Sequence, residues 1–342
     1  MAIPFGNTSA MLLNDSCFSA ASASASIITA VLILVSFLVG IIMNGSFLWV
    51  LGMKMKRTVN TLWFIHLILS YLLTCFLMPF FAVYIILDFH WALGEIMCKI
   101  VLSSFSVMRF TTVFLLTVIS LDRYLFTCHS VWSQRFRTAA LARRLITGVW
   151  LASLLLSAYS LLSLKTERVN GQMKCGYSFV FSKNTPMHLA FFLVQFLLAF
   201  LLPFIIILGC YCWISCEMKT KRLVRTGKPF RVLVAAVASF FICWLPFHLY
   251  HAALLASHIP EQITCILWDL AAAGVCFNVC GTPIIYLFVG EKFQQVFKTS
   301  MLTLLNKGFV DVPSSPGDNA NTTEDGGSGK HTQLKVRQGF SK

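Results

Sequence analysis

Charged side chains interrupt one long apolar segment of the chain at two places. Arg109 lies inside the segment, and Asp122, Arg123 and Tyr124 lie together near its end, in the stretch TVISLDRYLFTCHS. The 14 residues between the two arginines correspond to about 21 Å along an ideal helix. A charged residue in such a segment is costly and is therefore a candidate for function. The guanidinium fork suits a carboxylate, so the chemistry that Arg109 predicts is anion recognition.

Two alternatives for Arg109 remain open at this stage. In the first, it receives the acidic group of a ligand, such as a peptide C-terminus or a lipid carboxylate. In the second, it forms an internal ion pair with Asp269 or Asp88. The second alternative would compensate the charge within the protein and leave nothing for a ligand to neutralise.

Cysteines form a second set of candidate residues, in this case for disulfide bonds. Cys98 follows WALGEIM at the start of the same apolar segment, and Cys175 lies in a long connection further along the chain. An oxidising exterior predicts a disulfide between them, which would hold that connection over the helices. Cys17 and Cys265 are candidates for a second bridge. For the other cysteines we expect small apolar packing roles.

These residues must be positioned by membrane-spanning helices. The chain is 57% hydrophobic and 12% charged, with a mean hydropathy of +0.77, which is far more apolar than a soluble domain. Seven stretches reach the length needed to cross a bilayer. They are 27–52, 60–87, 98–128, 142–164, 187–213, 231–256 and 263–288. The predicted fold class is an all-α membrane protein, a seven-transmembrane helix bundle.

The distribution of basic residues predicts the orientation. Lys and Arg number 21 on the side of the first, third and fifth connections and the C-terminal tail, against 5 on the other side. The positive-inside rule then puts the N-terminus outside and the C-terminus in the cytoplasm. The net charge of +14 therefore faces membrane lipid and cytoplasmic partners, and we expect no nucleic acid.

The chain accordingly divides into four predicted parts. Residues 1–26 form an extracellular tail with glycosylation sequons at Asn7 and Asn14, and residues 27–289 form the helix bundle. Residues 290–306 form a short amphipathic helix in the membrane interface. Residues 307–342 form a disordered cytoplasmic tail. Its hydroxyl side chains are candidates for phosphorylation and arrestin recruitment: Ser314, Ser315, Thr322, Thr323 and Ser328.

Several motifs occur in a fixed order on these spans. They are Asn44 in GIIMNGSFLWV, the pair Cys98 and Cys175, the triplet Asp122-Arg123-Tyr124, Trp150, FFICWLPFHLY at 240–250 and GTPIIYLF at 281–288. Together they resemble the rhodopsin-like (class A) family of G-protein-coupled receptors, over residues 27–305. The resemblance implies an extracellular ligand and a heterotrimeric G protein as partners.

The resemblance also implies roles for individual residues. Arg123 would hold the resting state and then contact the G protein. Trp244 would sense the depth of the ligand, and Pro246 would let its helix swing outward. Tyr286 would rotate inward to support the open state. The switch residues are therefore Asp122, Arg123, Tyr124, Trp244, Pro246, Pro283 and Tyr286.

A narrower resemblance is carried by RTVNTLWFIHL, VWSQRFRT, KPFRVL and IIYLFVGEKF. These segments are similar to the formyl-peptide and chemoattractant receptor branch, including its orphan members, and imply coupling to an inhibitory-class G protein. Where the branch often has a basic residue in the fifth span, this chain has Gln195, so Arg109 is expected to replace it from the third span. The candidate ligand-binding residues are Phe105, Arg109, Gln195, His248, His251, Trp268 and Asp269. The alternative for both histidines is a hydrogen-bonded role within the bundle.

Two positions depart from the family pattern. Tyr71 replaces an aspartate of the second span and Thr282 replaces an asparagine of the seventh, and in the family these residues help to hold a sodium ion. Without the carboxylate we expect no sodium site. An alternative is that Tyr71 and Thr282 hydrogen-bond each other as a different switch. The departures keep a non-signalling decoy receptor open as an alternative function.

The sequence lacks the residues that other functions would require. Residues 263–288 contain no lysine for retinal, and the spans contain neither an HExxH motif nor paired aspartates, so we expect no enzyme, no cofactor and no metal. A transporter would need a polar pathway, which Arg109, Tyr71 and scattered histidines hardly provide.

Overall fold

The computed structural model describes residues 23–169, 171–178, 185–220, 227–256, 259–289, 295 and 298–299. The chain divides into two compact units, Met1–Met301 and Leu302–Lys342, and every described residue belongs to the first. The predicted glycosylation sites Asn7 and Asn14, the tail hydroxyls and nearly all of the predicted interfacial helix at 290–306 lie outside the described residues.

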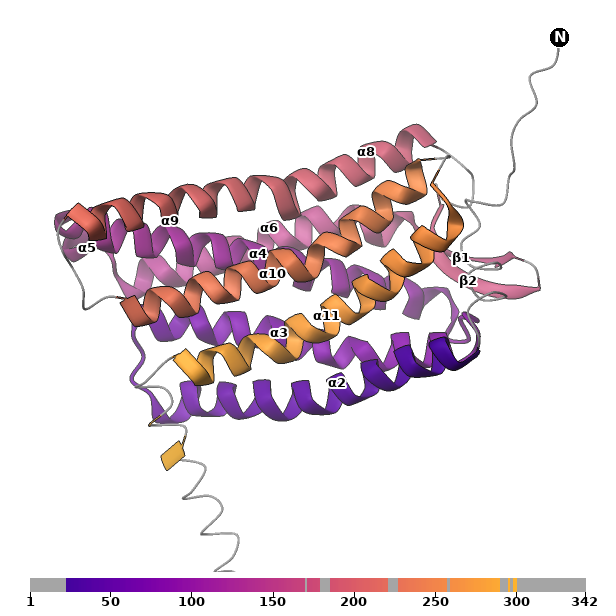
Figure 1. Ribbon diagram of the computed structural model, residues 1–342, viewed down its shortest axis with the longest axis horizontal. Coiled ribbons are helices and arrows are strands. Elements are labelled where there is room, and N and C mark those ends of the chain that lie inside the picture. Colours follow the sequence, from indigo (N-terminus) through magenta and orange to yellow (C-terminus); the bar gives the residue numbers. More distant parts are fainter. Residues whose placement is uncertain are drawn as a thin grey trace, which may run out of the picture. The chain divides into compact units, whose positions relative to one another are not determined.

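Seven stretches of helix in the described residues are long and apolar enough to cross a membrane, as the sequence predicted. They are Ser26–Lys54, Val59–Ile86, Gly94–Cys128, Ala139–Ser163, Pro186–Thr220, Val234–Leu255 and Gln262–Gly281. The underlying elements are α2 (Ala23–Trp49), η1 (Val50–Lys54), α3 (Val59–Ile86), α4 (Gly94–Cys128), α6 (Ala139–Ser163), α8 (Thr185–Phe196), η2 (Leu197–Leu201), α9 (Leu202–Thr220), α10 (Gly227–Leu255) and α11 (Glu261–Val289). Figure 1 shows them running side by side.

The helix that carries both arginines, α4, is the central one. Of its most apolar window, 72% is buried, whereas no other span in the described residues exceeds 44%. It packs against α3, α6 and α9 and makes smaller contacts with α10. The remaining spans expose large apolar side chains on their outer faces, as helices that face lipid do.

A β-hairpin closes one end of the bundle, at the right of Figure 1. Its strands, β1 (Leu164–Val169) and β2 (Gln172–Tyr177), pair antiparallel with Leu164 opposite Tyr177. The predicted disulfide is confirmed, since Cys175 of β2 is bonded to Cys98 of α4 with a Cα–Cα distance of 5.8 Å. We call this the hairpin end.

The opposite end carries Asp122 and the short helix α5 (Ser130–Phe136). Two spans begin here with threonine caps. Thr58 accepts a hydrogen bond from the Thr61 amide at 3.3 Å at the start of α3, and Thr138 accepts one from the Leu141 amide at 3.2 Å at the start of α6. Each cap satisfies an amide that a helix start leaves without a partner.

Two spans contain a π-helical turn, η1 in the first and η2 in the fifth. The turn η2 lies just before Pro203, which has no N–H to donate to the carbonyl group four residues earlier. Such turns place one additional residue in a helix and are frequent near functional sites. The fifth span therefore changes its helical phase between Gln195 and Tyr211.

The sixth and seventh spans approach each other closely at a glycine. A Cβ atom added to Gly274 of α11 would lie 2.2 Å from the carbonyl oxygen of Cys243 on α10. Only a residue without a side chain permits this approach, so Gly274 fixes the spacing of α10 and α11 directly beside Trp244.

Candidate functional site

Arg109 lies inside the bundle and is only 5% exposed. Its guanidinium carbon is 4.7 Å from the ring centre of Phe247, 5.6 Å from that of Phe110 and 5.7 Å from that of Trp244. Aromatic faces attract a cation through their quadrupole and partly replace the water that it has lost. The arginine is thereby bound to α10 as well as to its own helix.

One hydrogen bond holds the guanidinium from the fifth span, in which Nη2 of Arg109 donates to the amide oxygen of Gln195. The other two nitrogens, Nε and Nη1, are buried and have no hydrogen-bond partner among the described residues. An unsatisfied donor on a buried charged group costs more than one on a neutral group. The site therefore favours a group that brings further acceptors.

The internal ion pair considered from the sequence is not formed. Within the described part of the chain, no ion pair joins Arg109 to Asp88 or Asp269. Asp269 is exposed on α11, and Asp88 follows the end of α3 with a positive φ of 54°. The charge of Arg109 is thus met, among the described residues, by aromatic faces and one amide, without a carboxylate.

The geometry of the guanidinium makes the Gln195 contact informative. A carboxylate that binds with both oxygens uses either Nε with Nη2 or Nη1 with Nη2. Nη2 is common to both edges, and it is the nitrogen that Gln195 occupies. Nη2 has one hydrogen on each edge, so Gln195 occupies one edge and leaves the other open to a bidentate anion.

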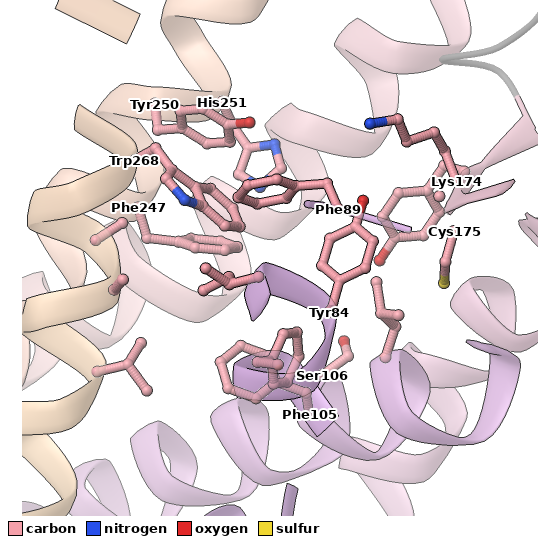
Figure 2. Close-up of a pocket in the computed structure, with 18 of the residues that line it drawn as sticks. Tyr84, Phe89, Phe105, Ser106, Lys174, Cys175, Phe247, Tyr250, His251 and Trp268 are labelled. Carbon is pink, nitrogen blue, oxygen red and sulfur yellow. The ribbon is translucent and has the colours of Figure 1, made fainter. Parts of the chain in front are cut away.

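A cavity of about 310 Å³ opens beside Arg109 toward the hairpin end. Among the lining residues in Figure 2, Phe247, Tyr250 and Trp268 lie together at the left, Tyr84 lies near the middle and Phe105 at the base of the view. Aromatic walls with a few polar groups are typical of small-molecule sites.

The structure separates the predicted ligand-binding residues into two groups. Phe105, Arg109, His251 and Trp268 are among the residues that line the cavity. Gln195, His248 and Asp269 are not among the described lining residues. The first two of these are buried, whereas Asp269 is exposed, and the roles of these three residues in ligand binding stay predictions.

His248 packs against aromatic rings, and its Nε2 has no hydrogen-bond partner among the described residues, so the hydrogen-bonded alternative is not seen at that nitrogen. Its ring centre is 4.9 Å from that of Phe200 and 5.6 Å from that of Phe196, both on the fifth span. The side chain is 3% exposed. His248 therefore joins α10 to the fifth span behind Arg109 and does not face the cavity.

The cavity connects to Trp244 through aromatic contacts. The ring of Phe105 lines the cavity and is 5.8 Å from the ring of Trp244, which is itself 5.6 Å from Phe247. Trp244 does not line the cavity within the described residues. A molecule in the cavity would act on Trp244 through Phe105, Phe247 and Arg109.

The hairpin supplies further polar groups to the cavity. Nζ of Lys174 donates to Gln172 at 3.0 Å and lies 5.9 Å from the ring of Phe89. The hydroxyl of Tyr177 donates to Ser160 at 3.4 Å. Burial raises the pKa of the Tyr177 phenol, so the group is protonated at neutral pH and is a hydrogen-bond donor.

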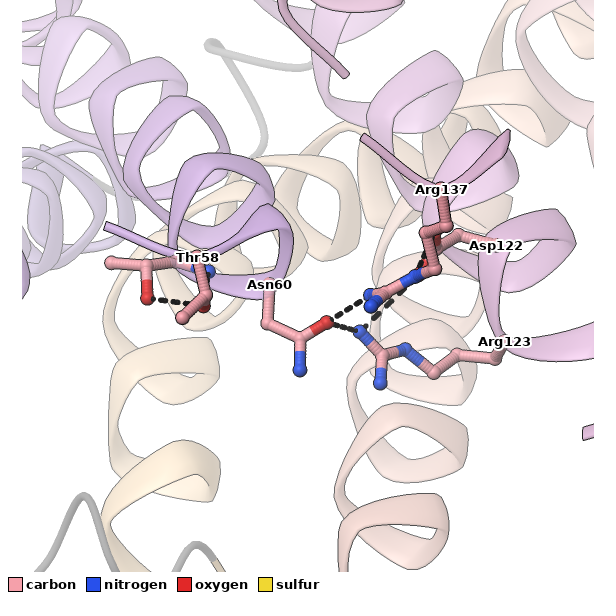
Figure 3. A network of polar contacts seen from close by, with 6 residues as sticks. Thr58, Asn60, Asp122, Arg123 and Arg137 are labelled. Atoms are coloured by element: carbon pink, nitrogen blue, oxygen red, sulfur yellow. Dashed lines mark hydrogen bonds and ion pairs between the residues drawn. The ribbon is translucent and has the colours of Figure 1, made fainter. Parts of the chain in front are cut away.

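A polar cluster occupies the opposite end of α4, as Figure 3 shows. Asp122 accepts two hydrogen bonds from Arg137, at 2.8 Å and 2.9 Å, and lies 3.3 Å from Arg123. Both arginines also donate to the side-chain oxygen of Asn60 on α3. We call Asn60, Asp122, Arg123 and Arg137 the Asp122 cluster.

Sequence reasoning identified Asp122 and Arg123 but not Asn60 or Arg137. The missing signal was helix capping, since Asn60 follows the cap Thr58 by two residues and Arg137 directly precedes the cap Thr138. The caps fix where α3 and α6 begin and thereby bring both side chains to Asp122. Tyr124 instead contacts His129, with 3.2 Å between its hydroxyl and Nε2.

Comparison with known proteins identifies the family. A family model described as "7 transmembrane receptor (rhodopsin family)" matches residues 43–286. The chain belongs to the rhodopsin family of receptors. It is 41% identical to "Probable G-protein coupled receptor 33" of Rattus rattus over 83% of this chain and 86% of that protein. It is 39% identical to the Homo sapiens protein of that name over 90% and 95%.

The receptor is also 31% identical to "N-formyl peptide receptor 3" of Homo sapiens, over 88% of this chain and 90% of that protein. The predicted membership of the chemoattractant branch of G-protein-coupled receptors is thus confirmed, and the chain is a multi-pass membrane protein.

The position of the family's sodium site lacks a carboxylate in this receptor. Tyr71 is buried where the family has an aspartate. The hydroxyls of Ser70 on α3 and Thr112 on α4 lie 3.0 Å apart. Asn44 donates to the carbonyl oxygens of Gly40 and Val279 at 2.9 Å and 3.1 Å. These neutral groups supply no negative charge for a cation. The side chain of Thr282 lies outside the described part of the receptor, so its predicted bond to Tyr71 stays a prediction.

Three further predicted residues, Pro283, Tyr286 and Cys265, are placed only in part. Pro283 and Tyr286 fall within the bounds of α11, where only the backbone is described. Pro246 lies inside α10. Cys265 is disulfide-bonded, and its predicted partner Cys17 lies outside the described residues.

Proposed function

We propose that this receptor binds an acidic extracellular ligand and responds by activating a heterotrimeric G protein of the inhibitory class. One observation carries the proposal. A buried guanidinium with two nitrogens lacking partners lines a cavity, and no carboxylate in the described residues neutralises it. An anion that enters the cavity would accept hydrogen bonds from these nitrogens and also balance the charge of Arg109.

The proposed orientation places the hairpin end outside the cell and the Asp122 cluster in the cytoplasm, at the plasma membrane. The excess of basic residues on the cluster's side supports it. So does the disulfide of Cys98 and Cys175, because such bonds persist in oxidising surroundings.

In the proposed mechanism, the anion binds Arg109 and changes its contacts with Phe247 and Trp244. The sixth span then moves about Pro246, and Arg123 leaves Asp122 for the G protein. Ligand and G protein would bias the same two-state equilibrium from opposite ends. Phosphorylation of the C-terminal tail and recruitment of arrestin would follow as part of the same proposal.

Nucleotide exchange on a purified G protein tests this function. The receptor is reconstituted in lipid nanodiscs with an inhibitory-class heterotrimer and screened with formylated peptides, chemotactic proteins and acidic lipids. We expect an acidic ligand to accelerate nucleotide exchange, and Arg109→Ala to remove that response. Saturable binding without exchange on any heterotrimer would instead establish the decoy alternative, and substrate flux through the receptor would establish a transporter.

A further inference from the structure

The described residues that line the cavity differ in the hydrogen-bonding groups that they offer to a ligand. Arg109, Lys174, Tyr177 and Trp268 contribute donors. The described lining contains no carboxylate and no amide side chain. The charged groups of this lining are donors and suit a ligand with an anionic part, while hydroxyls such as those of Thr74 and Ser106 and the ring of His251 can also accept.

One cation of the described lining has nitrogens that lack partners. Nε and Nη1 of Arg109 are unsatisfied, whereas Lys174, the other cation in that lining, donates to Gln172 on its own strand. Arg109 is 5% exposed, so an anion beside it is shielded from water and strongly attracted. The site is built for a single anionic group.

One part of the described cavity lining is aliphatic. Ile33 of α2, Met78 and Ile85 of α3, and Ala272 and Val275 of α11 form it, and these three helices pack against one another. We call these five residues the aliphatic side. They contribute no side-chain hydrogen-bonding group other than the weak thioether of Met78, so they suit hydrocarbon.

The size of the cavity agrees with a slender ligand. Its volume of about 310 Å³ is at the lower end of the range of roughly 300–1,000 Å³ for small-molecule sites. A hydrocarbon chain fills such a space without leaving polar groups unpaired, whereas a peptide of the same volume would bury several backbone amides.

We infer that the ligand is an unbranched aliphatic monocarboxylic acid of the fatty-acid type, with its carboxylate on Arg109 and its chain along the aliphatic side. The inference rests on the proposed function and narrows its ligand from acidic molecules in general to one class. The carboxylate takes the edge of the guanidinium that Gln195 leaves open, and Gln195 keeps its hydrogen bond to Nη2. No other group of the ligand needs a polar partner.

Direct binding to the full-length receptor in nanodiscs tests the inference without any G protein. The probes are saturated straight-chain acids from hexanoic to hexadecanoic acid, below their micelle concentrations, with the methyl ester and the primary alcohol of each chain as neutral controls. We expect affinity to rise roughly threefold for each methylene until the cavity is filled. The esters and alcohols should bind at least about tenfold more weakly.

Two receptor variants locate the ends of the ligand. Arg109→Gln should remove the difference between acids and esters, whereas Arg168→Gln, which changes an exposed arginine of the hairpin, should keep it. Ala272→Leu should shift the best chain to a shorter one without changing the preference for acids. If Ala272→Leu folds poorly, Val275→Phe serves the same purpose.

The outcomes separate this inference from the proposed function. Affinity that is independent of chain length, or equal for acids and esters, would overturn it. An acidic peptide that binds through Arg109 and activates the G protein while the fatty acids do not bind would also overturn it, yet would leave the proposed function intact. Arg109-dependent binding of fatty acids without nucleotide exchange would support the ligand class and contradict the signalling.

Discussion

Arg109 and Arg123 lie on the same helix, yet among the described residues only Arg123 has a carboxylate within reach. Asp122 lies 3.3 Å from Arg123 and accepts two further bonds from Arg137, so one acid serves two arginines. Arg109 has an amide and three aromatic rings instead. At one end of α4 the arginine thus has a carboxylate partner within the protein, and at the other it keeps a positive charge that a ligand can meet.

The comparison indicates which end of α4 can receive a ligand and which end can hold a resting state. A group that lacks partners gains from binding a ligand, because the penalty of burying it has already been incurred. A group with internal partners must lose them before it binds anything else. The Arg109 site is therefore suited to receive a ligand, and the Asp122 cluster is suited to hold a resting state.

Removing the shared acid should have the largest effect. In Asp122→Asn, both arginines lose their only carboxylate in the described cluster, at a cost of about 3 kcal/mol in the free energy of unfolding, since Asp122 is 10% exposed. We expect a lower melting temperature and faster nucleotide exchange without ligand. Glu95→Gln is the control, because its pair with Lys99 is exposed and contributes under about 1 kcal/mol. Equal effects of the two changes would contradict the restraining role of Asp122.

Separating the sixth and seventh spans should have the next largest effect. An alanine at position 274 would meet the carbonyl oxygen of Cys243, so Gly274→Ala forces α10 and α11 apart beside the contact between Trp244 and Arg109. We expect a loss of about 2 kcal/mol of stability and a change in ligand affinity, measured by thermal unfolding and radioligand binding. Gly209→Ala on α9 meets no atom within 4 Å and should be neutral or stabilising.

Giving Arg109 a carboxylate should make the two ends of α4 alike. Gln195→Glu replaces the amide that contacts Arg109 with an acid, so the hydrogen bond then joins two opposite charges and their attraction is added to it. We expect a higher melting temperature together with at least about tenfold weaker binding of acidic ligands. In an Arg109→Gln background the stabilisation should vanish, and its persistence there would show that the introduced carboxylate acts on another group.

Removing Arg137, which competes with Arg123 for Asp122, should have the smallest effect. Arg137→Gln removes the two shorter bonds to Asp122 and leaves that acid to Arg123. Because Arg137 is partly exposed, we expect a change of about 1 kcal/mol, seen as roughly fivefold slower nucleotide exchange without ligand. Arg143→Gln, at an exposed position of α6, is the matched control. Faster exchange in Arg137→Gln would show that Arg137 helps to hold the resting state.

The seven spans and the disulfide of Cys98 and Cys175 were predictable because apolar length and an oxidising exterior act locally and strongly. The predicted ends of the spans agree less well with the structure. The fifth was predicted to end at residue 213, yet its helix continues to Thr220, because the polar and basic residues after Trp213 prolong a helix that has already left the apolar layer.

The partner of Arg109 was less predictable. Charge complementarity favoured Asp269 or Asp88, but both lie near the hairpin end, and a carboxylate attracts water more strongly than it attracts a guanidinium at a distance. Gln195 is uncharged, and its position depends on the helical phase before η2, which hydrophobic spacing alone does not reveal. Arg137 was missed because its contact with Asp122 depends on where a cap starts α6.

The π turn η2 also determines how insertions and deletions in the fifth span would be tolerated. Each residue of a helix turns the chain by about 100°, so losing one residue within Leu197–Leu201 would leave a continuous rod of nearly the same length while rotating everything before it. Gln195 would then point away from the third span, and a different side chain would stand over Arg109. Loss of a single residue at this place would therefore change the side chain that Arg109 meets while leaving the fifth span long enough to cross the membrane.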